Sequence, residues 1–417
     1  MPRLRGTNSA GSSKNSKLAA HKPPNLKTGA KASAASAATQ AAAAGAAKKP
    51  PAGYQQKTLS HNLQQDLLDV FRRALAPALA SHRLNEALQA VKQALFERDF
   101  AGAFGTVDDG GSKKDEPSGT QTDEDVDGSI KKDGKSVTFA VDPPTSEAIP
   151  PPLDAYAARW SPTRALCYAS ILCSPVVQEH WSAASGSGTE TEPETETETE
   201  TKPALRMVAI GGGAAEIVAF GAMLTSGEAG ADAAGDLVLV DSGPWASVVD
   251  RLRSSMVEAR SDGRVPALVE PANRFNVDVR WRDILKVDDE EMGKMIGGGA
   301  AEKVTTLITL FFTLNELFTA GGLGAAATFL LRLTAAAPQG TALLVVDSPG
   351  SYAEMAVGSQ ARKYPMRWLL DKFLLQDAEG WDKVHEDEAT WFRLSPSLSY
   401  PIRLEDMRYQ MHLYVRK

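Results

Sequence analysis

Cysteine is scarce in this chain of 417 residues, and long apolar runs are missing from it. Its two cysteines, Cys167 and Cys173, are too few and wrongly spaced for a zinc site, and they favour reduced, buried thiols inside a cell. No uninterrupted stretch of about 18 apolar residues occurs, so no membrane span is expected. The first residues also lack the apolar segment of a secretory signal. We therefore expect neither a metal site nor membrane binding.

Acidic residues are missing from the first 57 positions, which contain ten Lys or Arg. The net charge of −7 at pH 7 therefore combines a basic tail with an acidic remainder. A basic tail can attract nucleic acid weakly and in a salt-dependent way, or it can serve solubility alone. Because residues 1–57 are rich in Ala, Ser, Lys and Pro, they have too little apolar surface for a core, and we expect them to be disordered.

Changes in composition divide the remainder of the chain. Residues 58–105 carry apolar side chains at helical spacing, as at Leu84, Leu88 and Val91. The next segments are predicted from composition and pattern as a disordered polar linker (106–150), a helical lead-in (151–182), an acidic Glu/Thr insertion (183–203) and one large domain (204–417). The insertion contains "TETEPETETETE", whose like charges keep it extended.

Apolar segments recur after residue 204 and predict strands at 205–210, 236–241, 276–281, 305–313 and 341–349. Helical patterns separate them at 214–225, 245–260 and 323–337, with a shorter polar crossover near 286–296. Nearly continuous apolar strands indicate a parallel sheet with helices on both faces. A helical segment at 363–376 and final strands at 390–395 and 411–417 complete the pattern. The prediction is an α/β, Rossmann-like fold of the class I methyltransferase type, with a mostly parallel seven-stranded sheet.

The stretch "IGGGAAE" occurs twice. The first copy, Ile210–Glu216, follows an apolar strand and precedes a helix, which is the context of a nucleotide-type glycine loop. Its glycines would let a ligand approach the backbone beside free helix N–H groups, and they are Gly211, Gly212 and Gly213. The second copy, Ile296–Glu302, precedes a strand and so lies at the wrong end of the sheet for binding. We interpret it as a connection.

Acidic residues indicate which ligand the first loop holds. Asp241, at the end of the second strand, can accept two hydrogen bonds from the ribose of either NAD or S-adenosylmethionine. Glu216 stands where a dinucleotide fold has a small residue, and its charge would repel a diphosphate at the helix start. S-adenosylmethionine has no phosphate and tolerates carboxylates. Asp283, after the third strand, is placed to accept from an adenine amino group. These glycines and acidic residues at the ends of three successive strands favour S-adenosylmethionine. The alternative is that they are turn residues that occur there by chance in another α/β domain.

Asn315 and Glu316 follow the fourth strand in "FFTLNELF". There they would lie beside the methyl donor, where orientation of the acceptor contributes most to the rate. A carboxamide can pair with an imide edge, and a carboxylate can take up the proton. The chain lacks the Asn/Asp-Pro-Pro-aromatic motif of enzymes that methylate exocyclic amino groups. These two residues are our catalytic candidates, and a helix cap is the alternative reading.

The sequence resembles the fungal 25S ribosomal RNA uridine-N(3) methyltransferase family. The resemblance covers about residues 60–105 and 151–417, in stretches such as "YAARWSPTRALCYA", "MVAIGGGAAEIVAF", "FTLNELF" and "LEDMRYQMHLY". It implies a class I fold, S-adenosylmethionine as cofactor, and methylation of N(3) of a uridine in large-subunit rRNA or a pre-ribosome. It transfers no established catalytic residue. The Ala-rich segment 226–235 and the Glu/Thr run have no match in the family pattern.

An RNA substrate needs a basic surface on this acidic protein. Lys363, Arg367 and Lys372, with Trp368 among them, follow the fifth strand near the expected acceptor side. Such a mixture of basic and aromatic side chains can pair with phosphates and stack an unpaired base. An amphipathic helix with ordinary solvated charges is the alternative.

Three functions remain open at this point. The leading one is a uridine-N(3) methyltransferase for rRNA, which would place the protein in the nucleus or nucleolus, with a cytoplasmic pool as a further option. The second is a methyltransferase with a protein or small-molecule acceptor. The third is a non-catalytic rRNA-binding assembly factor that retains the fold. Binding of S-adenosylmethionine separates the third from the other two.

Overall fold

The computed structural model describes residues 59–97, 99, 104, 148–181, 204–226, 233–259, 266–297, 305–350, 352–357 and 360–417. For residues 204, 320, 352–357 and 360–364 it describes the backbone alone. The predicted tail (1–57), most of the predicted linker (106–150) and the predicted insertion (183–203) lie outside these ranges.

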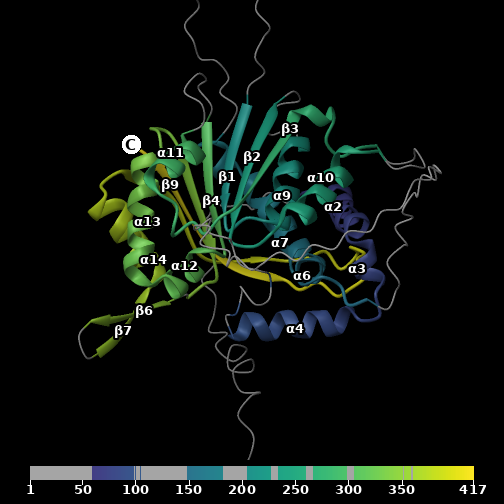
Figure 1. The fold of residues 1–417 in the computed structure, drawn as a ribbon. Coiled ribbons are helices and arrows are strands. Elements are labelled where there is room, and N and C mark those ends of the chain that lie inside the picture. The colour runs from purple at the N-terminus through teal and green to yellow at the C-terminus, as the bar shows by residue number, and fades with distance from the viewer. Residues whose placement is uncertain are drawn as a thin grey trace, which may run out of the picture. The chain divides into compact units, whose positions relative to one another are not determined.

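Seven strands form one sheet in the order β3-β2-β1-β4-β5-β9-β8 (Figure 1). Five of them run parallel: β1 (Ala204–Ile210), β2 (Ala234–Asp241), β3 (Phe275–Trp281), β4 (Thr305–Phe311) and β5 (Ala342–Asp347). The other two strands are antiparallel to their neighbours. β9 (Met407–Arg416) pairs with β5, and β8 (Trp381–Phe392) pairs with β9 at the edge of the sheet. This is the mostly parallel seven-stranded sheet that the sequence predicts. The strand order changes direction between β1 and β4, where ligands bind in open α/β sheets.

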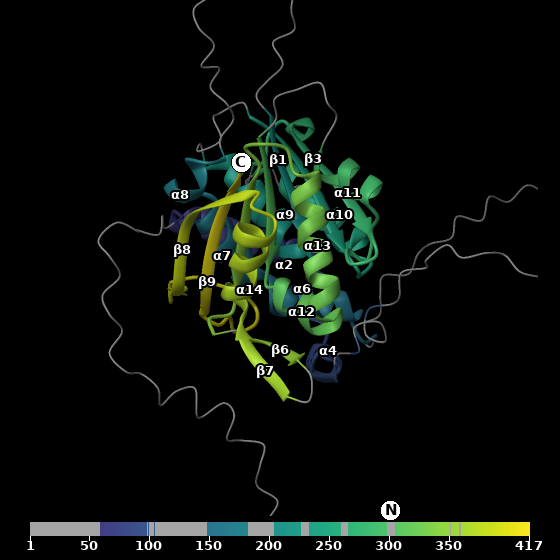
Figure 2. The ribbon, with the colours of Figure 1, turned by 90° about the vertical axis from the view of Figure 1, so that its left-hand side faces the viewer.

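Both faces of the sheet are buried because successive side chains of each strand point to opposite sides. Met207 and Leu239 pack into the core on one face, and Val208 and Val240 into the core on the other. The first face is covered by α2 (His61–Ala74), α7 (Ser161–Leu172), α9 (Ala214–Thr225) and α10 (Ala246–Val257). The second is covered by α11 (Asp289–Ile296), α12 (Leu314–Ala320), α13 (Gly322–Ala336) and α14 (Met366–Asp371), as the side view shows (Figure 2).

Helix α2 belongs to the same core as the sheet, whereas the buried residues of the helix Leu84–Glu97 form a smaller cluster with Ala155. Leu67, Leu68 and Phe71 of α2 are fully buried, in one cluster with side chains of α7 and α9. Ser60 begins α2, and its hydroxyl accepts from the Leu63 N–H at 3.2 Å. The remaining helices of this region are α3 (Ala76–Ala80), α4 (Leu84–Glu97), α6 (Pro152–Arg159) and α8 (Pro175–Gln178). α4 and α6 lie beyond the carboxyl ends of the parallel strands (Figure 1).

The structure corrects the prediction between β5 and the C-terminus. Residues 363–365 are not helical, because they belong to a hairpin of β6 (Tyr352–Val357) and β7 (Gln360–Pro365). The helix starts only at Met366, directly after Pro365, and passes into a π-helical segment, Lys372–Asp377. The strand predicted at 390–395 is the last part of β8, which ends at Phe392, and the strand predicted at 411–417 belongs to β9. Within the described ranges, no helix has the length and apolar character needed to cross a membrane.

Candidate cofactor site

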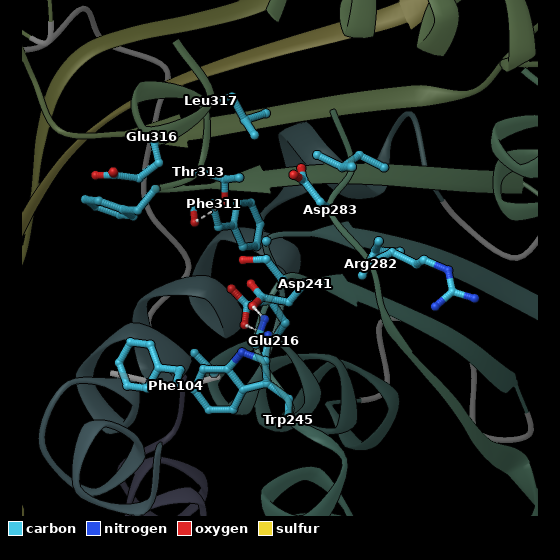
Figure 3. Close-up of a pocket in the computed structure, with 18 of the residues that line it drawn as sticks. Phe104, Glu216, Asp241, Trp245, Arg282, Asp283, Phe311, Thr313, Glu316 and Leu317 are labelled. Atoms are coloured by element: carbon cyan, nitrogen blue, oxygen red, sulfur yellow. Dashed lines mark hydrogen bonds between the residues drawn. The ribbon is translucent and has the colours of Figure 1, made fainter. Parts of the chain in front are cut away.

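A cavity of about 820 Å³ opens at the carboxyl ends of β1 to β4 (Figure 3). The loops that follow these strands form its floor, with Gly211, Asp241, Asp283 and Thr313 among the lining residues. The N-terminal helical region closes its other side through Leu95 of α4, Phe104, Tyr156 of α6 and Arg164 of α7. The cavity therefore lies at the place where the fold class binds its ligands.

The three glycines of the first loop serve different purposes. Gly211 lines the cavity with φ +71°, and a Cβ there would lie 2.2 Å from the Thr313 Oγ1. A Cβ at Gly213, which also lines the cavity, would lie 2.7 Å from the Trp245 ring. Gly212 is not among the lining residues, and a Cβ there would meet the Ala209 side chain at 2.6 Å. Only Gly211 and Gly213 thus expose backbone to a ligand, whereas Gly212 allows the loop to pack on β1.

Glu216 closes the start of α9 with its own side chain. Its Oε2 accepts from the Gly213 N–H at 2.7 Å, and the side chain is buried at the cavity wall. Burial raises the pKa of Glu216 to about 7, although the Gly213 N–H and the charge of Arg164 oppose the rise. Because a carboxylate occupies the helix N-terminus, a phosphate has no place there. This arrangement disfavours a dinucleotide.

Asp241 ends β2 next to Glu216 (Figure 3). Its Oδ1 accepts from the Gly243 N–H at 2.6 Å, and the Trp245 side chain also donates to it. Burial raises the pKa of Asp241 to about 6, against these two hydrogen bonds. A carboxylate offers about four acceptor positions, so it retains capacity for ligand hydroxyls.

Asp283 lies after β3 on the same edge of the cavity. Its Oδ1 accepts from the Leu285 N–H at 3.1 Å, and its Oδ2 lies 3.6 Å from the Lys286 Nζ. Ile284 and Leu285 line the cavity beside it and supply apolar surface. An acceptor beside apolar side chains suits the edge and the face of a heteroaromatic ring.

The two catalytic candidates lie on α12 but not equally near the cavity. Glu316 lines the cavity and is exposed to solvent, whereas Asn315 is not a lining residue. The backbone N–H of Asn315 donates to the buried Asp347 carboxylate at 3.2 Å. Phe312, between β4 and α12, has φ +56° and lines the cavity. A bulky residue in the left-handed region is strained, and such strain is concentrated at functional sites.

The sequence does not indicate most of the other lining residues, and four of these carry an aromatic or charged side chain that can contact a ligand: Tyr156, Arg164, Trp245 and Phe312. They come from segments far apart in the chain, so spacing alone could not bring them together. One of them does leave a signal in the sequence. Arg164 is the single charged residue of α7, and the structure buries every other residue of that helix. A lone charge on an otherwise buried helix needs a partner or a ligand.

The second "IGGGAAE" starts at the end of α11, and residues 298–302 lie outside the described part of the chain. Neither Ile296 nor Gly297 lines the cavity.

Of the four residues predicted to bind RNA, Lys363 lies on β7 and its side chain is not described. Arg367 pairs with Glu386 and Glu388, and Lys372 pairs with Asp377 at 2.6 Å. Trp368 is 46% exposed. In the described ranges no three His, Cys, Asp or Glu side chains form a group that could hold a metal ion.

Comparison of the sequence with known proteins identifies its family. The model described as "Putative SAM-dependent methyltransferase" matches residues 146–415. A curated relative from Saccharomyces cerevisiae, the 25S rRNA (uridine(2843)-N(3))-methyltransferase, is 27% identical over 382 residues, which cover 84% of this chain and 85% of the relative.

Solved structures with a similar arrangement include the CcbJ methyltransferase of Streptomyces caelestis and the N-methyltransferase NodS of Bradyrhizobium japonicum with S-adenosyl-L-homocysteine. Their identities are 11% and 10% and their TM-scores 0.28 and 0.27. Each similarity covers 51% of this chain, with 83% and 78% of the respective structure. The family match spans more than half of the sequence, and it includes the whole sheet except the last residue of β9. The chain belongs to the family of S-adenosylmethionine-dependent methyltransferases.

Proposed function

We propose that the protein methylates N(3) of a uridine in large-subunit rRNA. The observation that supports this best is the relative from Saccharomyces cerevisiae, whose similarity extends over 84% of this chain. That similarity reaches the cofactor cavity and also the helices that close it. It therefore extends beyond the part of the fold that methyltransferases of different acceptors share.

The cavity fits S-adenosylmethionine, the methyl donor of the family. In our proposal Asp241 accepts from the ribose hydroxyls and Asp283 accepts from the adenine amino group. Gly211 and Gly213 let the methionine part approach the backbone, and Glu216 receives its ammonium group. Since Glu216 already accepts from the helix start, the site suits a cationic ligand part better than a phosphate.

The acceptor chemistry requires one proton to leave. When bound, S-adenosylmethionine supplies a methyl group on a positively charged sulfur. N(3) of uridine carries a hydrogen, which has to be lost when a methyl group takes its place. We assign this proton to the Glu316 carboxylate, since Glu316 lies on the β4 side of the cavity and reaches solvent. Asn315 stays our second candidate, for pairing with the imide edge of the uridine, although it does not line the cavity itself.

The RNA surface belongs to the same proposal. Lys363, Arg367, Trp368 and Lys372 would contact RNA beside the acceptor, and Trp368 offers exposed aromatic surface for stacking. Arg367 and Lys372 already have acidic partners, so RNA phosphates would have to compete with these. A uridine inside folded rRNA would be turned out to reach the donor. With an rRNA substrate, our proposal has the protein act in the nucleus or nucleolus, with a cytoplasmic pool as the further option.

Mass spectrometry of digested rRNA tests this function. We expect large-subunit rRNA from cells without the gene to lack one 3-methyluridine, and expression of the wild-type chain to restore it. Expression of the Glu316→Gln variant should restore at most a small part. Unchanged 3-methyluridine would contradict the proposal and favour a protein or small-molecule acceptor. Restoration by a variant that cannot bind the cofactor would instead indicate a non-catalytic assembly factor.

A further inference from the structure

The guanidinium of Arg164 lies at the cavity wall, and the cofactor contacts proposed above do not include it. It comes from α7, whose other residues are all buried and uncharged. Burial of a charge is unfavourable unless a partner compensates for it. An arginine kept in such a helix, at the wall of a ligand cavity, is therefore expected to meet an anion.

The protein itself supplies only part of that compensation. The Arg164 Nη1 donates to the Tyr156 hydroxyl, and the guanidinium lies 5.6 Å from the centre of the Tyr156 ring and 5.5 Å from that of Phe312. Glu216 attracts Arg164 through its charge, yet among the described residues no carboxylate forms an ion pair with it. A guanidinium has five N–H donors, so the cavity side retains donors for a ligand.

The other cations at the cavity are engaged elsewhere. Arg282 donates to Glu291 at 3.0 Å, and Lys286 lies 3.6 Å from Asp283. Both follow β3 and lie on the surface, at the end of the cavity that we assign to adenine. Arg164 is therefore the cation at the opposite end of the described cavity wall.

The strand order gives the direction of the ligand. Asp283 and Asp241 follow β3 and β2, so the adenosine part would lie over this half of the sheet. The sheet continues with β1 and β4, whose ends carry Gly211 and Phe312. The methionine part must therefore extend toward Phe312, over which Arg164 lies. This end of S-adenosylmethionine carries an ammonium group and a carboxylate.

We infer that Arg164 binds the carboxylate of S-adenosylmethionine, beside Glu216, which receives the ammonium group. The guanidinium and the carboxylate match in planar geometry as well as in charge, which favours a paired hydrogen bond. The Tyr156 and Phe312 rings both lie next to the guanidinium, and the hydrogen bond to the Tyr156 hydroxyl limits its rotation at the cavity wall. Arg164 and Glu216 together would recognise the zwitterionic end of the cofactor. The inference rests on the proposed cofactor orientation and is independent of the RNA acceptor.

Decarboxylated S-adenosylmethionine tests the inference, because it keeps the ammonium group and lacks only the carboxylate. Calorimetric titration of the full chain with both ligands, without RNA, gives two dissociation constants. The wild type should bind S-adenosylmethionine more tightly than the decarboxylated compound. The Arg164→Gln variant should lose about 10- to 100-fold in affinity for S-adenosylmethionine, which is the range for a hydrogen bond between charged groups. Its affinity for the decarboxylated compound should stay within about threefold, a change worth less than 1 kcal/mol.

Glu216→Gln is the matched control. It should weaken both ligands by a similar factor, because both carry the ammonium group, and it should leave binding of 5′-methylthioadenosine unchanged. Tyr156→Phe keeps the ring and removes the hydroxyl, so we expect a smaller loss than for Arg164→Gln that is again confined to S-adenosylmethionine.

Equal losses for both ligands in Arg164→Gln would overturn the inference and give the arginine a structural role. If that variant does not fold, equal losses in Tyr156→Phe would do the same. Failure of rRNA methylation would leave all these binding results unaffected.

Discussion

At the scale of single residues, the electrostatics of the cavity depend on buried charged groups. Glu216 and Asp241 lie next to each other, and burial raises the pKa of both carboxyl groups. Arg164 lies close enough to oppose this effect at Glu216. The ligand-free site therefore holds more negative charge than its surroundings favour, and a cationic ligand relieves that condition.

The Glu216→Gln variant tests this through the pH dependence of stability. Glutamine keeps an oxygen for the Gly213 N–H and removes the charge. The pKa of Glu216 rises on folding from its ordinary 4.5 to about 7, so its ionisation destabilises the fold progressively as the pH rises through this window. We expect the variant to be more stable than the wild type at pH 8, on the order of 1–3 kcal/mol, and the difference to disappear near pH 4.5.

Urea unfolding of the ligand-free protein at pH 8 and at pH 5 measures this difference. A variant that is less stable than the wild type at pH 8 would show that Arg164 stabilises the ionised carboxylate more than burial disfavours it.

Gly211→Ala tests the glycine loop. An alanine at this position would have to keep the positive φ of Gly211, which is unfavourable for it. Its Cβ would also lie 2.2 Å from the Thr313 Oγ1. We expect a loss of roughly 2–4 kcal/mol in unfolding free energy and weaker binding of S-adenosylmethionine. Gly340→Ala is the matched control, since Gly340 has φ +83° and open space around its Cβ position. It should cost about 1 kcal/mol and leave binding unchanged. Equal losses in the two variants would mean that strain alone accounts for the need for Gly211.

At the scale of elements, the sequence predicts the strands that are buried on both faces of the sheet, because such strands are apolar along nearly their whole length. β1, β2, β4 and β5 are nearly continuous apolar runs, and all four appear where the pattern indicates them. Only the last three residues of β8 fall in a predicted strand, since the sequence of β8, "WDKVHEDEATWF", alternates between partly buried and exposed side chains at the sheet edge. Neither strand of the β6–β7 hairpin is predicted, because the hairpin pairs only with itself and projects away from the core (Figure 1).

The site follows the same rule. Gly211, Asp241 and Asp283 could be predicted because they lie at the ends of strands that the sequence reveals, or within two residues after them. Arg164 and Tyr156 could not, since their place at the cavity depends on how α6 and α7 pack against α9 and α10. The positive φ of Phe312 is also invisible in the sequence, because nothing about a phenylalanine indicates that conformation.

Phe104 tests the contribution of the N-terminal region to the cavity. Its ring lies 6.0 Å from that of Tyr156, edge to face, and it lines the cavity. Phe104→Ala should weaken S-adenosylmethionine binding several-fold, because it opens the wall beside the ligand. Phe96→Ala is the control, since Phe96 is 85% exposed and does not line the cavity. Calorimetric titration measures both, and equal affinities in the two variants would argue against a closing role for this region.

At the scale of the whole molecule, helix α2, which precedes the sheet in sequence, is part of its core. Leu67, Leu68 and Phe71 would become exposed if α2 were removed, and each large apolar side chain contributes about 1.5–3 kcal/mol through burial. The division of the chain at residues 57, 105, 150, 182 and 203 remains a prediction. The buried residues of α2 nevertheless lie in one core with those of the sheet, so we expect the two to fold together.

Two truncated proteins test this. A chain that starts at Gln56 keeps all the described helices, and we expect its thermal unfolding midpoint to equal that of the full chain. A chain that starts at Asp99 loses α2, α3 and α4, and should unfold at a much lower temperature or aggregate. Similar midpoints for both truncations, measured by differential scanning calorimetry, would show that the sheet and its other helices are stable without this region.

The most direct test of the whole account is methyl transfer by the purified protein. Labelled S-adenosylmethionine is incubated with deproteinised large-subunit rRNA, and the RNA is digested to nucleosides. We expect label in 3-methyluridine with the wild type, and a strong decrease with Asp241→Asn. Label in any other nucleoside, or none in the RNA while S-adenosylmethionine binds normally, would contradict it.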